Sequence, residues 1–168
     1  MSVEFNVEVC QTQSNKKRFG LCDDPAPKKN HAYIDELDGK KWIAVVDNQF
    51  IYAVTFTAID NCIMINREDG NPAKRCDGVL TFNNSVIFVE LKVNAPKGND
   101  WVKEAEIQLR TSISYFEKTE EAQGFKIKMA YAANRAHPKL KESQIRRMNQ
   151  FLKDTGYVLR IEARIILN

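Results

Sequence analysis

The segment between residues 75 and 92 constrains this 168-residue chain more than any other, because it has the pattern of a β-hairpin. Residues 79–82 and 86–89 are runs of β-branched, aromatic and aliphatic side chains, which favour strands. Asn83, Asn84 and Ser85 lie between the two runs, and asparagine tolerates the positive φ of a tight turn. We therefore predict two antiparallel strands joined by a short loop.

The length of that loop sets which residues face each other. A two-residue loop places Asp77 directly across from Glu90, whereas a three-residue loop places Gly78 there. Two facing carboxylates about 5 Å apart repel each other unless a positive charge, such as a metal ion, lies between them. Lys92 points to the same face as Glu90, because side chains alternate along a strand. The spacing thus predicts a small site of two acids and an ammonium group.

Composition places the chain among ordinary globular proteins, with 43% hydrophobic and 28% charged residues. We expect one domain over residues 1–168, with 1–48 as an N-terminal strand and irregular extension and 49–168 as the core. No apolar run reaches the roughly 18 residues that span a bilayer, so we expect no membrane segment and a cytoplasmic protein. The net charge of +3 is compatible with an anionic partner but does not require one.

Cysteine and histidine usage argues against several other kinds of site. The four cysteines form no Cys-x-x-Cys pair and lack histidines nearby, so we expect reduced thiols without zinc or disulfides. His31 and His137 share no ligand spacing, and no histidine-based nuclease site is indicated. The glycines form neither a P-loop nor a Gly-x-Gly-x-x-Gly element, which excludes the simplest nucleotide-binding sites.

The region before the hairpin is predicted to contain few regular elements. Residues 3–9 alternate between apolar and polar, as in a strand at a sheet edge. Residues 12–38 are rich in Asn, Lys, Asp, Pro and Gly, and most of them are expected to be irregular. Residues 42–46 fit either a helix or a strand, residues 50–59 fit a strand, and residues 67–74 fit a loop.

An amphipathic helix is the clearest element after the hairpin. Asn99 or Asp100 is suited to cap it. Spacings of three and four give one apolar face, made of Trp101, Ala105, Leu109, Ile113 and Phe116. Gln108 lies seven residues after Trp101, so we expect it near the face that packs on the sheet.

The remaining pattern predicts a strand at 125–133, then a helix from Pro138 to about residue 154 with Leu140, Met148, Phe151 and Leu152 buried. Gly156 ends that helix, and residues 157–167 form a last strand. This order of elements indicates an α/β domain with a central mixed β-sheet flanked by helices.

Residues 75–114 resemble the PD-(D/E)xK nuclease superfamily, whose members carry an Asp on one strand and an acid-x-Lys at the end of the next. Asp77, Glu90 and Lys92 match that pattern, and Gln108 matches the glutamine of the following helix. Cys76 stands where the proline of the motif's name would be. The resemblance implies a restriction-endonuclease-like core and a metal-dependent endonuclease. It also implies an upstream acid, for which Glu36 or Asp47 is a candidate.

Phosphodiester hydrolysis requires charge neutralisation and an in-line water, and Mg²⁺ held by carboxylates provides both, with Mn²⁺ as an alternative. Asp77 and Glu90 would hold the ion, together with the carbonyl of Leu91. Lys92, which two carboxylates keep protonated, would orient the water, and Gln108 would position Lys92, water or substrate.

The expected substrate is DNA, with RNA as an alternative, and cutting both strands would call for a homodimer. Lys74 and Arg75, close to the hairpin, are the best-placed nucleic-acid contacts. The second predicted helix and its surroundings carry further basic candidates, which are Lys139, Lys141, Arg146, Arg147 and Lys153. That face is equally consistent with an ordinary solvated surface.

Two other interpretations compete with an active nuclease. Glu90 and Lys92 could be exposed residues at the end of a strand, with Asp77 in an Asp-Gly kink. Alternatively, the fold could be that of a nuclease while the domain is catalytically silent and binds nucleic acid or a protein partner. Cleavage assays with variants of Glu90 and Lys92 would distinguish these cases.

Overall fold

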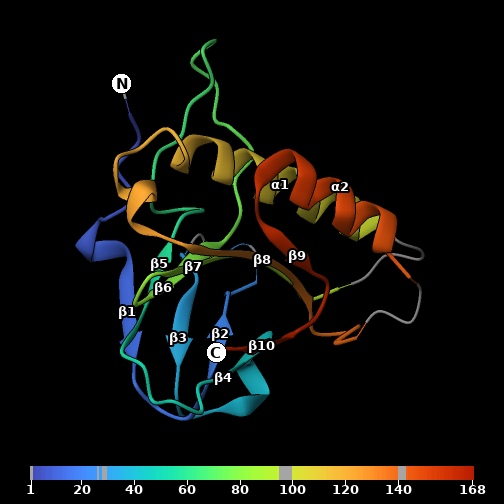
Figure 1. The fold of residues 1–168 in the computed structure, drawn as a ribbon. Helices are drawn as coiled ribbons and strands as arrows, with labels where there is room; N and C mark the ends of the chain where they lie inside the picture. Colours follow the sequence, from blue (N-terminus) through green and yellow to red (C-terminus); the bar gives the residue numbers. More distant parts are fainter. Residues whose placement is uncertain (1, 26, 28–29, 95–99, 140–142) are drawn as a thin grey trace.

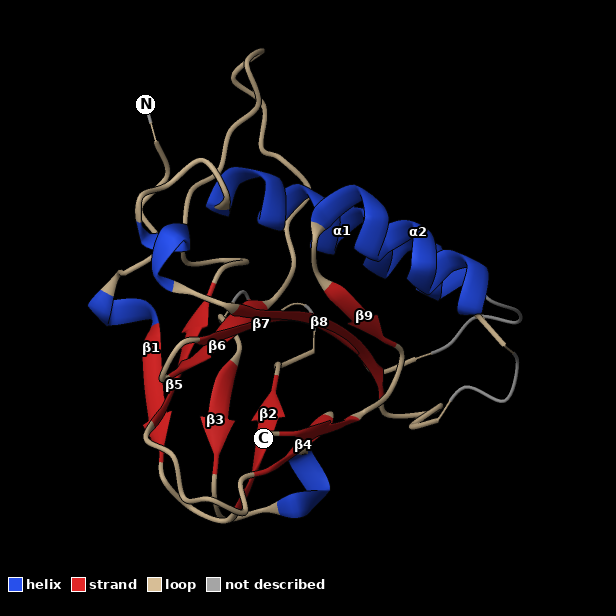
Figure 2. Ribbon diagram, in the orientation of Figure 1, coloured by secondary structure: helices blue, strands red, loops and turns tan. Residues whose placement is uncertain are grey.

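The fold is built from three layers, which are two helices, a six-stranded sheet and a four-stranded sheet (Figure 1). The computed structural model describes residues 2–25, 27, 30–94, 100–139 and 143–168. Figure 2 shows the helices on one face of the larger sheet and the smaller sheet toward its other face. This is the predicted α/β class, with a mixed sheet and helices.

The larger sheet has the order β1-β5-β6-β7-β8-β9. Its strands are β1 (Gln11–Ser14), β5 (Val54–Ala58), β6 (Gly78–Phe82), β7 (Ser85–Lys92), β8 (Ile127–Asn134) and β9 (Val158–Arg160). The first four strands pair antiparallel, whereas β7, β8 and β9 run parallel. The predicted hairpin therefore lies at the centre of this sheet.

The smaller sheet has the order β10-β4-β2-β3. Its strands are β10 (Arg164–Ile166), β4 (Ala44–Asp47), β2 (Arg18–Cys22) and β3 (Tyr33–Asp35). The two α-helices are α1 (Asp100–Phe116) and α2 (Ile145–Thr155), and short 3-10 helices cover Glu8–Cys10, Gly39–Lys41 and Glu121–Gly124. None of the helices among the described residues is long and apolar enough to cross a membrane.

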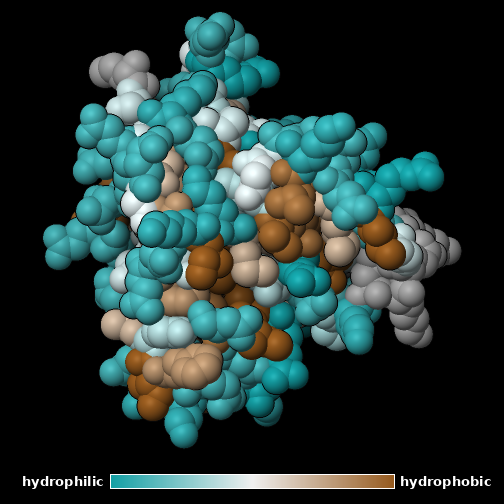
Figure 3. Space-filling model, viewed as in Figure 1, coloured by the Kyte–Doolittle hydropathy of each residue, from teal (hydrophilic) through white to brown (hydrophobic). Residues whose placement is uncertain are grey.

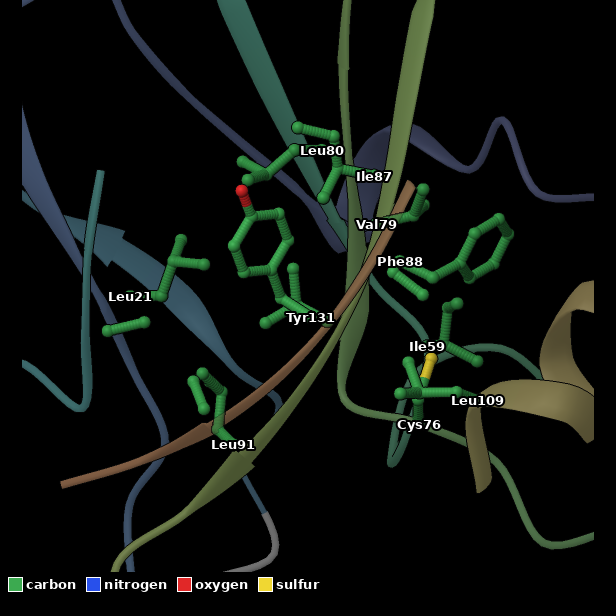
Figure 4. Close-up of a cluster of buried hydrophobic side chains, with 14 of the residues drawn as sticks. Leu21, Ile59, Cys76, Val79, Leu80, Ile87, Phe88, Leu91, Leu109 and Tyr131 are labelled. Carbon is green, nitrogen blue, oxygen red and sulfur yellow. The ribbon is translucent and has the colours of Figure 1, made fainter. Parts of the chain in front are cut away.

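The core fills the spaces on both faces of the larger sheet. Figure 4 shows Val79 and Phe88 on the side of helix α1, with Leu109 of that helix, while Leu91 and Tyr131 point toward Leu21 of the smaller sheet. The near-continuous burial of β7 follows from this, because a strand covered on both faces needs apolar side chains at every position. The predicted apolar face of α1 is confirmed, since all five of its residues are buried.

The N-terminal third is more regular than its composition suggests. The strand predicted at 3–9 is wrong, because residues 11–14 pair with β5 and occupy that sheet edge. Phe5 instead inserts its ring between Phe88 and Phe116, with centroids 6.5 and 5.3 Å away. Most of the described residues in 12–38 are irregular, as predicted, but this region also supplies β2, β3 and most of β1, which its composition did not indicate. Pairing with distant strands overrides local preference there.

Three expectations for the C-terminal third are corrected. Helix α2 begins at Ile145 and not at Pro138, whose carbonyl accepts a 2.9 Å hydrogen bond from Ala163 in extended chain. The last predicted strand is divided between the two sheets, as β9 and β10. Leu152 is 45% exposed, although it was expected to be buried. Gly156 ends α2 with φ 79°, as predicted, whereas Leu140 lies outside the described residues.

The expectation of four reduced cysteines is wrong for two of them. Cys10 and Cys62 form a disulfide, while Cys22 and Cys76 are buried thiols. The bond joins the segment before β1 to the turn after β5, so it ties together two segments that the sheet already brings near each other. No spacing rule signals such a pair, because the two cysteines are separated by 52 residues.

The surface is mostly hydrophilic on the face seen in Figure 3, where hydrophobic residues form small groups near the middle. The larger exposed apolar side chains include Leu37 at 93% and Val9 at 81%. Scattered apolar residues of this kind are normal on folded proteins.

Candidate functional site

The hairpin has the register that a two-residue loop predicts. Phe82 pairs with Ser85, and Asn83 has a positive φ of 48°. The ladder continues to the pair of Gly78 and Val89, so the next position outward brings Asp77 opposite Glu90. The alternative register, with Gly78 opposite Glu90, is excluded.

Backbone N–H groups donate hydrogen bonds to the carboxylates of Asp77 and Glu90. The Asp77 N–H donates to Glu90 Oε2 at 3.2 Å, and the Leu91 N–H donates to Asp77 Oδ2 at 2.6 Å. Gly78 is needed next to them, because a Cβ at that position would lie 2.2 Å from the Phe56 ring. The backbone therefore fixes both carboxylates before any ligand arrives.

Both carboxylates are buried, with 7% of Asp77 and 3% of Glu90 exposed. The interpretation of Glu90 as an exposed strand-end residue is therefore wrong. Burial raises the pKa of Asp77 well above its usual range, and the Glu90 charge raises it further. Burial likewise raises the pKa of Glu90 from 4.5 to about 7, although Lys92 opposes the rise. The surroundings therefore do not fully compensate the negative charge that this pair would carry when both groups are ionised.

Lys92 and Gln108 complete the predicted group. Lys92 Nζ lies 3.1 Å from Glu90 Oε1 and donates a 3.0 Å hydrogen bond to Gln108 Oε1. Gln108 Nε2 donates in turn to the carbonyl of Arg75 at 3.3 Å, on the segment that leads to Asp77. Gln108 on α1 thus holds both the Lys92 ammonium group and the backbone that leads into β6. The structure brings all four predicted side chains together.

Asp23 is a site residue that the sequence interpretation missed. It follows β2 in the smaller sheet, and its carboxyl group lies close enough to Asp77 for that residue to lower its pKa. Burial raises the pKa of Asp23, and the nearby Asp60 and Asp24 raise it further. The available sequence signal was weak, because it consists only of two acids after a short apolar run in a region expected to be irregular.

The two upstream acids that were candidates lie elsewhere. Glu36 is exposed and lines a separate surface pocket of about 300 Å³ beside β1 and β5. Asp47 is buried and forms ion pairs with Arg18 and Arg164. Asp47 therefore holds the smaller sheet together, and neither residue is placed to act with Asp77.

Charges around the site do not balance. Arg75 pairs with Asp60 at 3.1 Å, and Lys92 pairs with Glu90. Asp77 and Asp23 have no cationic partner among the described residues. In the absence of another ligand, two neighbouring carboxyl groups of this kind must share a proton.

Asp77 and Glu90 offer only oxygen atoms as possible metal ligands. Within the described part of the chain, no three His, Cys, Asp or Glu side chains are arranged to hold a metal ion. Two facing carboxylates are nevertheless the usual protein contribution to a Mg²⁺ site, because Mg²⁺ keeps several waters and takes its other ligands from phosphate groups. The residues present fit Mg²⁺ or Mn²⁺ better than zinc, which favours sulfur and nitrogen ligands.

The predicted nucleic-acid contacts differ in their surroundings. Arg75 is engaged by Asp60, and Arg147 of α2 pairs with Glu106 of α1, so both charges are already compensated. Lys74 and Arg146 are exposed. Of the additional candidates on or before α2, Lys139 and Lys153 are exposed, and Lys141 lies outside the described residues. Arg147 serves to join the two helices.

Comparison with known proteins gave no match, whether to a family model, a curated protein or a solved structure.

Proposed function

We propose that the protein is a Mg²⁺-dependent nuclease with a restriction-endonuclease-like core, most simply a DNA endonuclease. The observation that carries the proposal is the Asp77–Glu90 pair, which is held by backbone hydrogen bonds and joined to Lys92 and Gln108. Each of the four side chains was expected at this site from the resemblance to PD-(D/E)xK nucleases. The geometry supports that expectation at the level of individual contacts.

The electrostatics support a divalent cation as the missing partner. Burial raises the pKa of Asp77, of Glu90 and of Asp23, so keeping these carboxyl groups ionised inside the protein is costly. When bound, a Mg²⁺ ion supplies positive charge for the phosphodiester and lowers the pKa of a coordinated water. Asp77 and Glu90 would hold it, with the Leu91 carbonyl as a further oxygen donor.

Lys92 contributes a fixed positive charge beside the reacting group. It is held by Glu90 at 3.1 Å and by Gln108 at 3.0 Å, so its ammonium group loses little freedom when substrate binds. Its ammonium group can donate hydrogen bonds to a water or to a phosphate oxygen. Its role would be to orient the water and to stabilise developing negative charge.

The test is cleavage of supercoiled and linear DNA, and of RNA, in Mg²⁺ and in EDTA. Glu90→Gln and Lys92→Met should each lower the cleavage rate at least 100-fold. Lys103→Met and Glu104→Gln are matched controls, because both residues are exposed on helix α1, and they should cleave at the wild-type rate. Cleavage that survives both site substitutions would refute the proposal.

A second candidate is a catalytically silent domain that binds nucleic acid or protein. The burial of Asp77 and Glu90 favours it, because a phosphodiester must reach these carboxylates before it can be cut. DNA binding that is the same in EDTA and Mg²⁺, without cleavage, would support this candidate. A homodimer is proposed only for cutting both strands, and sedimentation with and without DNA tests it.

A further inference from the structure

The parallel strands β7 and β8 end side by side at the site. Lys92 and Asn134, the last residues of the two strands, are direct partners in the ladder, so their side chains lie on the same face. In open sheets, ligands bind in the crevice beyond the carboxyl ends of parallel strands. Asn134 is therefore beside Lys92 in the sheet, although the two residues are 42 positions apart in sequence.

Asn134 carries an unused hydrogen-bond donor. Its side chain is fully buried, and its Oδ1 accepts the N–H groups of Ala136 at 2.8 Å and His137 at 3.3 Å. These two bonds fix the orientation of the amide, because the opposite orientation would face NH₂ toward two N–H donors. Nδ2 then has no partner among the described residues. Leaving a buried donor without a partner is unfavourable, so a ligand is its natural explanation.

Arg135, the next residue along the chain, presents a cation. Its N–H donates to the Lys92 carbonyl at 2.9 Å, and its Nη2 donates to the Lys41 carbonyl at 2.8 Å. Its side chain is exposed and has no acidic partner among the described residues. Six other arginines do have one, and these are Arg18, Arg67, Arg75, Arg110, Arg147 and Arg164. Arg135 is thus held in position by backbone carbonyls while its charge stays available.

We propose that Asn134 and Arg135 bind a phosphodiester group of the substrate, next to the group positioned at Asp77 and Glu90. Both residues offer only donors at this place, which selects an anion, and phosphate oxygens are the acceptors that fix a nucleic-acid chain on a protein. The proposal rests on the proposed nuclease function and adds the path that the bound nucleic acid follows away from the site. The nucleic-acid backbone would run past the end of β8 and not across α2.

Binding tests this proposal independently of cleavage. Fluorescence anisotropy with a labelled DNA duplex in Ca²⁺ measures affinity at several salt concentrations. Arg135→Ala should weaken binding roughly tenfold and reduce the salt slope by about one. Asn134→Asp keeps the acceptor for Ala136 and His137 but removes the donor, so it should weaken binding at least as much. Lys17→Ala is the control, since Lys17 is exposed beyond the opposite end of β2 and should bind as wild type does.

The outcomes separate this proposal from the nuclease assignment. If wild type cleaves DNA while both substitutions bind as Lys17→Ala does, the phosphate contact is refuted and the nuclease function stands. If wild type neither binds nor cleaves, both fail. Thermal unfolding checks that the variants fold, and if Asn134→Asp does not fold, the exposed Arg135 decides the result alone.

Discussion

Replacing Glu90 by Gln should change how stability depends on pH in the absence of metal. The folded protein raises the pKa of Glu90 from 4.5 to about 7, mainly through burial. Between these values the folded state binds a proton that the unfolded state has released. Stability is therefore greatest below pH 4.5 with respect to this group, and it is lost as the pH rises through 7. The raised pKa of Asp77 acts in the same direction.

The size of the loss follows from the shift in Glu90. At 1.36 kcal/mol for each pKa unit, a rise from 4.5 to about 7 corresponds to about 3 kcal/mol of stability lost by pH 8.5. For a domain of this length, 1 kcal/mol changes the melting temperature by about 2 to 4 °C. The wild-type melting temperature in EDTA should thus fall by about 6 to 12 °C from this group. A glutamine cannot ionise, so its variant should lack that part of the fall.

Calorimetry or circular dichroism in EDTA at several values between pH 4.5 and 8.5 measures the effect. Glu104→Gln is the control, because that side chain is exposed on α1 and its variant should reproduce the wild-type profile. Adding Mg²⁺ at pH 8.5 should restore the melting temperature of wild type and not of Glu90→Gln. If the melting temperatures of wild type and Glu90→Gln change equally with pH, burial does not raise the pKa of Glu90, and the reasoning is refuted.

Two further predictions concern the framework around the site. Gly20→Ala should lower the free energy of unfolding, measured by urea denaturation, by about 2 to 3 kcal/mol, because a Cβ there would lie 1.9 Å from the Trp42 ring. Gly124→Ala is the control and should be nearly neutral, because a Cβ at that position would have no atom within 4 Å. Reducing the bond between Cys10 and Cys62 should lower stability by about 4 kcal/mol, as expected for opening a loop of this size, and a melting temperature unchanged by dithiothreitol would contradict that value.

The hairpin and helix α1 were predictable because local signals and burial agree. The asparagine turn sets the register that places Asp77 opposite Glu90, and the spacing of apolar residues orients Gln108 toward Lys92. Each of these inferences needs only neighbouring residues and the geometry of one element. The same information placed α1, whose apolar face is buried as expected.

The second sheet was not predictable from the same rules. Its strands are short, and residues of β2 pair with residues of β4 that lie 23 to 29 positions later, while β4 also pairs with β10 near the C-terminus. Composition in this region favoured loops, so Asp23 received no role and two other acids were considered instead. Asn134 was missed for a related reason, because its proximity to Lys92 depends on the parallel pairing of β7 and β8.

The placement of β10 has a consequence for the newly made chain. This strand leaves the ribosome after every residue of the site, yet it pairs with β4, which in turn borders the strand that leads to Asp23. A nascent chain can close the central hairpin early, but its smaller sheet is incomplete until translation has passed residue 166. We therefore expect nascent chains that stop before residue 164 to lack the fully assembled acid cluster, which would keep the proposed nuclease inactive until the smaller sheet has closed.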